Sequence, residues 1–207
     1  MVGIVNYGTG NIFAIANIYK RLNIDYIISS DIKELKLATH LILPGVGAFD
    51  ETMRILNSSG LKLFLDEMVL EKQKPVMGIC VGMQLLGEGS EEGDLEGFGW
   101  IKGYVKKIDS TLLKEKPYLP HLGWNTVEVQ RTNPIFYNID YQRGFYFLHS
   151  YYFECTDDKD ILGTTTYGLT YASAINHNNV FGMQFHPEKS HQNGLMIFCN
   201  FFNFFNT

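Results

Sequence analysis

The sequence predicts an α/β fold, in which a mainly parallel open sheet is flanked by helices and extended by antiparallel strands in the C-terminal half. Three observations support this prediction. Short apolar strands alternate with amphipathic helices through the first half, glycine-rich loops follow three of these strands, and strand-like pieces separated by turns begin at about Trp100. No internal repeat, low-complexity segment or linker interrupts the pattern, so we expect one domain over residues 1–207.

In the first half, each apolar run has the length and period of one element. We expect strands over residues 3–5, 26–28, 40–43 and 76–79, and helices over residues 12–22 and 61–70. Glycine-rich loops at residues 7–11, 44–47 and 78–82 follow strand ends. Such glycines can simply make turns, but ligands of parallel sheets bind at the carboxyl ends of the strands. The loops therefore mark the expected site.

The second half reads as antiparallel additions to this core. We expect strands over residues 124–129, 144–153, 161–167, 171–175 and 180–185. The final apolar run, over residues 195–204, predicts a helix whose aromatic side chains pack into the core.

Composition excludes several classes of protein. Apolar residues make up 45% of the 207 residues and charged residues 19%, which is typical of a folded globular chain. The net charge of −5 and the absence of a lysine or arginine run argue against a nucleic-acid surface. The first residues lack both a basic segment and a long apolar stretch, so we expect neither an export signal nor a membrane span.

Cysteine and histidine usage points to a reducing cytoplasm and to a site without metal. Cys80, Cys155 and Cys199 are an odd number without metal-type spacing, which argues against a disulfide framework. None of the six histidines belongs to a His-Glu-X-X-His pair. We expect no metal and no cofactor.

The most informative segment is Gly78-Ile79-Cys80-Val81-Gly82. An apolar run precedes it and another follows, so a strand is expected to turn sharply into a helix at Cys80. The flanking glycines permit a strained turn, and the unpaired N–H groups at the start of a helix favour a thiolate. The segment thus predicts a cysteine nucleophile, although a buried structural cysteine has the same local pattern.

A second segment, Phe185-His186-Pro187-Glu188, offers the partner groups. Residues two apart on an extended segment share a face, so His186 and Glu188 are expected to point the same way. The carboxylate can then orient the imidazole and hold one tautomer. Cys80, His186 and Glu188 together predict an acyl-transferring triad.

These segments resemble the signatures of a known family. Residues 78–84, Gly-Ile-Cys-Val-Gly-Met-Gln, and residues 184–188, Gln-Phe-His-Pro-Glu, resemble those of the class I, or triad, glutamine amidotransferases. Residues 43–49, 119–125, 146–151 and 187–190 are similar to the branch that forms the glutaminase subunit of imidazole glycerol phosphate synthase in histidine biosynthesis. The resemblance runs from residues 6–8 to the last helix.

The resemblance implies hydrolysis of L-glutamine to L-glutamate and ammonia. Cys80 would attack the carboxamide, His186 would move the proton and Glu188 would orient the imidazole. The oxyanion would be held by the N–H of Val81 and by the Gly45-Val46 peptide. Substrate contacts fall on Gly47, Gln84, His149, Ser150 and Tyr151. A polar helix surface is the alternative for Gln84, and a buried core histidine is the alternative for His149.

The resemblance also implies a partner. In the family, a barrel-shaped cyclase subunit forms a heterodimer with the glutaminase, receives ammonia through an interior channel and makes imidazole glycerol phosphate and an aminoimidazole carboxamide ribotide. Interface positions of the family match Asn11, Trp124, Tyr146 and Lys189. A tryptophan packed in the core is the alternative for Trp124, and a solvated surface charge is the alternative for Lys189. The family's dependence on its partner implies little activity in the isolated chain.

Two departures keep other functions open. Asn6 stands where many relatives have aspartate, and residues 87–93 are unusually rich in glycine. A paralogous glutaminase subunit that feeds another acceptor, such as a sugar-amidating synthase of surface polysaccharide, is therefore an alternative. A free-standing cysteine hydrolase and a degenerate regulatory binding subunit are two further alternatives.

Overall fold

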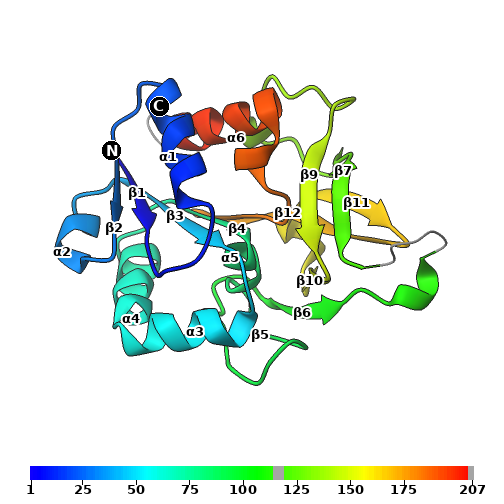
Figure 1. The fold of residues 1–207 in the computed structure, drawn as a ribbon, viewed down its shortest axis with the longest axis horizontal. Helices are drawn as coiled ribbons and strands as arrows, with labels where there is room; N and C mark the ends of the chain where they lie inside the picture. The colour runs from blue at the N-terminus through cyan, green and yellow to red at the C-terminus, as the bar shows by residue number, and fades with distance from the viewer. Residues whose placement is uncertain (114–118, 205–207) are drawn as a thin grey trace.

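The computed structural model describes residues 1–113 and 119–204 and has a large sheet between helices (Figure 1). One half of this sheet is parallel, in the order β2-β1-β3-β4-β13. Every residue of β1, β3, β4 and β13 is buried, because helices cover both faces of this half. The strands are β2 (Tyr26–Ser29), β1 (Val2–Val5), β3 (His40–Gly45), β4 (Val76–Cys80) and β13 (Val180–Met183).

The other half is mostly antiparallel and continues the same sheet in the order β13-β12-β10-β6-β5. A side branch joins β11 and β8 to β12, and β7 pairs with β9 in a separate two-stranded sheet. This architecture confirms the predicted fold class. These strands are β12 (Leu169–His177), β10 (Tyr151–Cys155), β6 (Gly103–Lys107), β5 (Gly89–Ser90), β11 (Ile161–Tyr167), β8 (Glu128–Val129), β7 (His121–Asn125) and β9 (Phe145–His149).

Helices flank the parallel half. In Figure 1, α1 (Ile12–Arg21) and α6 (His191–Phe204) lie on one side of the sheet, and α3 (Phe49–Ser58) and α4 (Leu61–Asp66) lie on the other. A π-helical turn, η1 (Glu67–Glu71), continues α4, and α2 (Ile32–Leu35) and α5 (Val81–Gln84) are single turns. Phe198 and Phe201 of α6 are fully buried, as the sequence predicted for this run. The 3-10 turns are η2 (Ser110–Leu112), η3 (Pro134–Phe136), η4 (Asp158–Asp160) and η5 (Pro187–Lys189).

Several predicted boundaries are wrong. The expected strand 144–153 is divided at Ser150, because β9 leaves the large sheet to pair with β7 whereas β10 pairs with β6 and β12. The expected strand 124–129 is likewise divided between β7 and β8. Helix α3 was not predicted, although Phe49, Thr52, Met53 and Leu56 form its buried stripe at helical spacing.

The largest correction concerns residues 180–185. The sequence grouped this run with the antiparallel additions, but β13 is parallel to β4 and antiparallel only to β12. Met183 pairs with Ile79, so both chains leave the sheet at the same edge. This parallel pairing brings His186 beside Cys80 although about a hundred residues separate them.

In the described part of the chain, none of the helices is both long enough and apolar enough to span a bilayer.

Candidate active site

The turn at Cys80 is a strained strand-to-helix elbow. Cys80 has φ 54° and ψ −112°, a conformation that non-glycine residues rarely adopt, and it ends β4 just before α5. The elbow fits only because its neighbours lack side chains. A Cβ on Gly78 would lie 2.3 Å from the Gly82 oxygen, and a Cβ on Gly82 would lie 2.0 Å from the Leu43 oxygen. A Cβ on Gly45 would similarly approach the Gly82 nitrogen to 2.1 Å. Backbone contacts between β3, β4 and α5 therefore hold the thiol in place.

The imidazole and carboxylate of the predicted triad are in contact and buried. His186 Nδ1 lies 2.8 Å from Glu188 Oε1, and both side chains are 2% exposed. The segment is not extended as the sequence suggested, since residues 187–189 form the 3-10 turn η5. The His186 N–H donates to the Tyr146 oxygen at 2.8 Å, which ties the histidine to β9. Within the described residues, His186 Nε2 is buried with no partner in hydrogen-bond geometry.

The charges around His186 favour its protonated form. Burial by itself lowers the pKa of His186, but Cys80 and then Glu188 act in the opposite direction and raise it well above its ordinary value. The Cys80 group thus stabilises the imidazolium even though its sulfur does not meet hydrogen-bond geometry with Nε2. Triad contacts of this kind often shorten only when substrate binds. His186 can therefore hold a proton beside the Cys80 sulfur.

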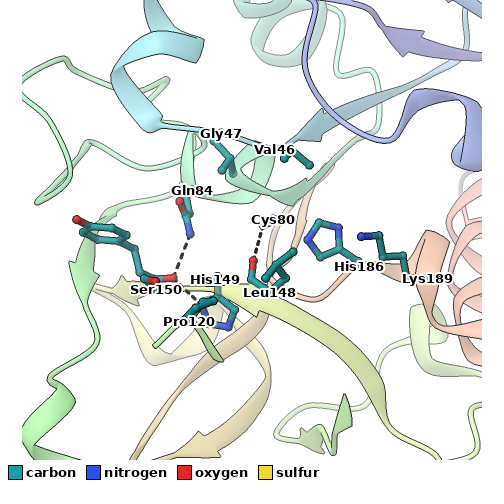
Figure 2. Close-up of a pocket in the computed structure, with 12 residues that line it drawn as sticks. Val46, Gly47, Cys80, Gln84, Pro120, Leu148, His149, Ser150, His186 and Lys189 are labelled. Carbon is teal, nitrogen blue, oxygen red and sulfur yellow. Dashed lines mark hydrogen bonds between the residues drawn. The ribbon is translucent and has the colours of Figure 1, made fainter. Parts of the chain in front are cut away.

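The two predicted oxyanion segments flank Cys80. Val81 is the first residue of α5, where N–H groups have no partner within the helix. Gly45 ends β3 directly beside Cys80 in the sheet register. Val46 is 48% exposed, and Figure 2 shows Val46 and Gly47 above the thiol. The N–H of Phe49, where α3 begins, donates to Glu92 Oε2 at 2.9 Å, so a carboxylate from another loop anchors the end of this segment.

A cavity of about 290 Å³ opens at the thiol (Figure 2). This volume suits a small metabolite. Nearly all the predicted catalytic and substrate residues meet there; Gly45 and Glu188 lie just behind the surface. Pro120 and Leu148 were not predicted as part of the wall. The lining consists of Val46, Gly47, Cys80, Val81, Gln84, Pro120, Leu148, His149, Ser150, Tyr151, His186 and Lys189.

Gln84 lies in the cavity wall rather than on a helix surface. It is 2% exposed, and its Nε2 donates to the Tyr151 oxygen and to Gln184 Oε1, at 3.1 Å each. Gln184, for which the sequence predicted no role, is fully buried, and its Nε2 lies 3.8 Å from Cys80 Sγ. The signal was present, because Gln184 precedes His186 by two residues in the second motif.

His149 combines the two alternatives that the sequence left open. It lines the cavity, yet it is only 6% exposed and both ring nitrogens have protein partners. Nδ1 lies 2.8 Å from the Tyr151 oxygen and Nε2 lies 3.0 Å from the Tyr171 hydroxyl. Burial, with smaller effects from His121 and His186, lowers the pKa of His149 to about 3. A neutral imidazole fully engaged in this way supports the wall.

Three of the four predicted interface residues form one cluster beside the cavity. The Lys189 ammonium lies 5.4 Å from the Tyr146 ring centroid, and Trp124 meets the Tyr146 ring edge-on at 6.3 Å. Trp124 also stacks on His191 at 5.2 Å and is 47% exposed, so it is not a core tryptophan. Asn11 stands apart from this cluster in the sequence, at the N-cap of α1. Among residues 1–113 and 119–204, no group of three or more acidic, histidine or cysteine side chains could hold a metal ion.

Comparisons with known proteins agree with this geometry. The model of the family "Glutamine amidotransferase class-I" matches residues 4–204. The chain is 46% identical to the "Imidazole glycerol phosphate synthase subunit HisH" of Leptospira interrogans, over 97% of this chain and 98% of that protein. It is 45% identical to the protein of the same name from Bdellovibrio bacteriovorus, with the same coverage.

Solved structures share the fold at low sequence identity. A structure described as a glutamine amidotransferase matches with a TM-score of 0.74 and 16% identity, covering all of this chain and 99% of that chain. The PurLQS structure from Thermotoga maritima matches with a TM-score of 0.69 and 19% identity, covering 98% of this chain and 97% of that chain. At these identities the likeness concerns the fold alone.

Proposed function

We propose that this chain, which belongs to the class I glutamine amidotransferases, is the glutaminase subunit of an imidazole glycerol phosphate synthase. The observation that carries the proposal is the convergence of Cys80, His186 and Glu188 at one cavity. Relatives named as that subunit align with nearly the whole chain, which supports the choice of branch. The substrate is then L-glutamine, and the reaction is hydrolysis of its carboxamide to L-glutamate and ammonia.

The first half of the reaction forms a thioester. The Cys80 thiolate attacks the carboxamide carbon, and the oxyanion accepts hydrogen bonds from the Val81 N–H and from the Gly45-Val46 peptide. Each donor of this kind lowers the barrier by about 3 kcal/mol. His186, held as imidazolium by Glu188, gives its proton to the departing nitrogen, and ammonia leaves.

The second half releases glutamate. His186, now neutral, takes a proton from water as the water attacks the thioester, and the collapse of the second tetrahedral intermediate returns the sulfur to Cys80. Glu188 contacts His186 Nδ1 throughout and stabilises the imidazolium each time it forms. The reaction thus crosses two barriers of the same type, one that forms the thioester and one that hydrolyses it.

The substrate's polar groups have suitable partners in the cavity wall. Because both hydrogens of the Gln84 amide are engaged, this residue offers its carbonyl oxygen to an N–H of the ligand. Gly47 and residues 149–151 line the cavity beside it and supply backbone groups. We assign glutamine binding to these residues.

Ammonia is useful only if it reaches an acceptor before it escapes or becomes ammonium in water. We therefore propose that a cyclase subunit of barrel fold docks as a heterodimer and receives the ammonia through an interior channel. The exposed Trp124 and the neighbouring Tyr146 and Lys189 form the docking face, together with Asn11. Aromatic side chains of this kind are typical anchors of protein interfaces. Three unpaired cysteines support a reducing cytoplasm as the compartment.

The test is glutamine hydrolysis by the chain together with a histidine-pathway cyclase and its ribotide substrate. Cys80→Ala should abolish glutamate release, whereas Cys155→Ala, which changes a free cysteine on β10 outside the cavity, should retain it. The Cys80→Ala complex should still make imidazole glycerol phosphate from added ammonium salt. Full glutaminase activity in Cys80→Ala would refute the assigned nucleophile.

The same assay separates the alternatives. Glutamine hydrolysis without imidazole glycerol phosphate formation, with any cyclase offered, would indicate a paralogous subunit for another acceptor. Hydrolysis of peptides or esters without a partner would indicate a free-standing hydrolase. Binding of the cyclase without any hydrolysis would indicate a regulatory subunit.

A further inference from the structure

Three buried side chains outside the triad form a hydrogen-bonded chain behind the cavity wall. His121 on β7 and Tyr171 on β12 are each 3% exposed, and His149 on β9 is 6% exposed. The Tyr171 hydroxyl lies 2.8 Å from His121 Nδ1 and 3.0 Å from His149 Nε2. His121 lies in residues 119–125, one of the segments that resemble the family, but it has no role in the hydrolysis described above.

The direction of every hydrogen bond in this chain follows from its last acceptor. The Tyr151 oxygen is a carbonyl, so His149 Nδ1 must carry the proton that it receives. His149 Nε2 therefore accepts from the Tyr171 hydroxyl, and the Tyr171 oxygen accepts from the N–H at His121 Nδ1. His121 Nε2 is left to accept from the Asn125 amide at 3.3 Å. Each imidazole is thereby fixed in one neutral tautomer.

Ring stacking and burial keep these hydrogen-bonded side chains in place. The His121 ring is stacked between Phe147 at 4.7 Å and Tyr167 at 4.0 Å, with interplanar angles of 12° and 10°. Burial lowers the pKa of His121 to about 4, so this imidazole, like His149, is uncharged at neutral pH. The stacking fixes the plane of the His121 ring, and the hydrogen bonds to Tyr171 and Asn125 lie at its two nitrogens.

The far end of the chain reaches the substrate site. The Tyr151 oxygen that accepts from His149 also accepts from Gln84 Nε2 at 3.1 Å. If that carbonyl turned away, the Gln84 amide would lose one of its two partners and could rotate in the wall. The orientation of the Gln84 carbonyl oxygen, which is offered to glutamine, thus depends on His121 on β7. Two side chains, Tyr171 and His149, and the Tyr151 carbonyl connect the two residues.

We propose that His121 and Tyr171 are positioning residues for glutamine binding, which hold His149, the Tyr151 carbonyl and Gln84 in the arrangement that the substrate meets. The inference rests on the proposed glutaminase function. It assigns to this chain of side chains an effect on substrate affinity and none on the chemical step, because none of its groups contacts the thiol or its base.

The decisive variant is Tyr171→Phe, which keeps the ring and removes the hydroxyl. In the complex with the cyclase, KM for glutamine should rise about tenfold while kcat stays within about twofold. Tyr152→Phe is the matched control. The Tyr152 ring centroid lies 5.7 Å from that of Tyr171, but Tyr152 is not one of the hydrogen-bonded residues His121, Tyr171 and His149. An unchanged KM in Tyr171→Phe, an equal rise in Tyr152→Phe, or a loss confined to kcat would each overturn the proposal.

A pair of variants at His121 repeats the test, so that the result does not depend on whether the single variant Tyr171→Phe folds correctly. His121→Asn retains a donor close to the position of Nδ1, whereas His121→Leu has none. KM should rise about tenfold in His121→Leu and about threefold or less in His121→Asn. Equal KM values for these two variants would contradict a hydrogen-bonding role.

Alkylation of Cys80 separates failure of this inference from failure of the proposed function. Iodoacetamide reports the thiolate alone, whereas a diazoketone analogue of glutamine must also occupy the cavity. Tyr171→Phe should react with iodoacetamide at the wild-type rate and with the analogue about tenfold more slowly at low concentration. If the wild-type chain neither hydrolyses glutamine nor reacts with the analogue, the proposed function fails. If it does both and Tyr171→Phe matches it, only the positioning role fails.

Discussion

The two sides of the cavity are held in place by different interactions. On the elbow side, β3, β4 and α5 meet through main-chain contacts that exist because Gly45, Gly78 and Gly82 have no side chains. On the opposite side, β7, β9 and β12 are joined by hydrogen bonds among buried polar side chains. The first wall is fixed by steric exclusion and tolerates no added atom. The second is held by bonds that single substitutions or a change in pH can weaken one at a time.

The largest effect is expected at the triad, where the two walls meet. Glu188→Gln keeps the size of the side chain but removes the charge that stabilises the His186 imidazolium. We expect kcat to fall by about 10³-fold, measured as glutamate release in the complex with the cyclase. Glu91→Gln, at an exposed carboxylate that pairs with Lys106, is the control. A fall of less than about tenfold in Glu188→Gln would mean that the charge is dispensable.

The next effect tests steric exclusion in the elbow wall. Gly78→Ala places a methyl group 2.3 Å from the Gly82 oxygen, in backbone that has no room to move. The free energy of unfolding in urea should fall by about 3 kcal/mol. At Gly60, φ is 75° but the added Cβ meets nothing within 4 Å beyond the adjoining backbone, so Gly60→Ala should cost only about 1 kcal/mol. Equal costs at both positions would show that the elbow accommodates the added methyl group and is not fixed by steric exclusion.

The third effect concerns the polar wall and appears as acid sensitivity. Burial lowers the folded-state pKa of His121 to about 4 and of His149 to about 3, against an ordinary 6.5. Below pH 6.5 the unfolded chain binds protons that the folded chain does not, so stability is complete above 6.5 and falls toward pH 4. Each histidine contributes up to about 1.4 kcal/mol per pH unit.

Two other histidines modify this profile. His40 contributes in the same direction, since burial and then the N-terminal charge lower its pKa to about 4. His186 has the opposite sign, because its raised pKa adds stability below 6.5 that is lost as the pH rises through its folded value. Urea unfolding at about pH 7, 6 and 5 measures the net slope. His121→Asn should make it shallower, and an unchanged slope would contradict the assignment.

The smallest effect is expected outside both walls, on the proposed docking face. Trp124→Ala should weaken association with the cyclase by about 1–2 kcal/mol, measured by titration calorimetry, because a half-exposed indole becomes buried in the complex. Leu63→Ala is the control, since Leu63 is 77% exposed on α4, remote from β7 in Figure 1. Equal binding by wild type and Trp124→Ala would remove Trp124 from the interface.

Local patterns predicted the elements near the thiol well. The strand before Cys80, the helix after it and the contact between His186 and Glu188 all depend on residues close together in the sequence. Elements whose form depends on distant partners were predicted less well. The run 144–153 reads as one strand by its composition, and only its pairing with two different sheets divides it at Ser150.

The sequence by itself determined which groups can react: a cysteine between glycines, a histidine with a carboxylate two residues on, and the glycine loops that offer backbone donors. These features are local, so a linear pattern encodes them. Only the tertiary structure decided that β13 lies parallel to β4, that Gln184 supports the thiol, and that His121, Tyr171 and His149 form one chain. Such pairings are chosen by the packing of whole faces against one another, and no short stretch of residues contains that information.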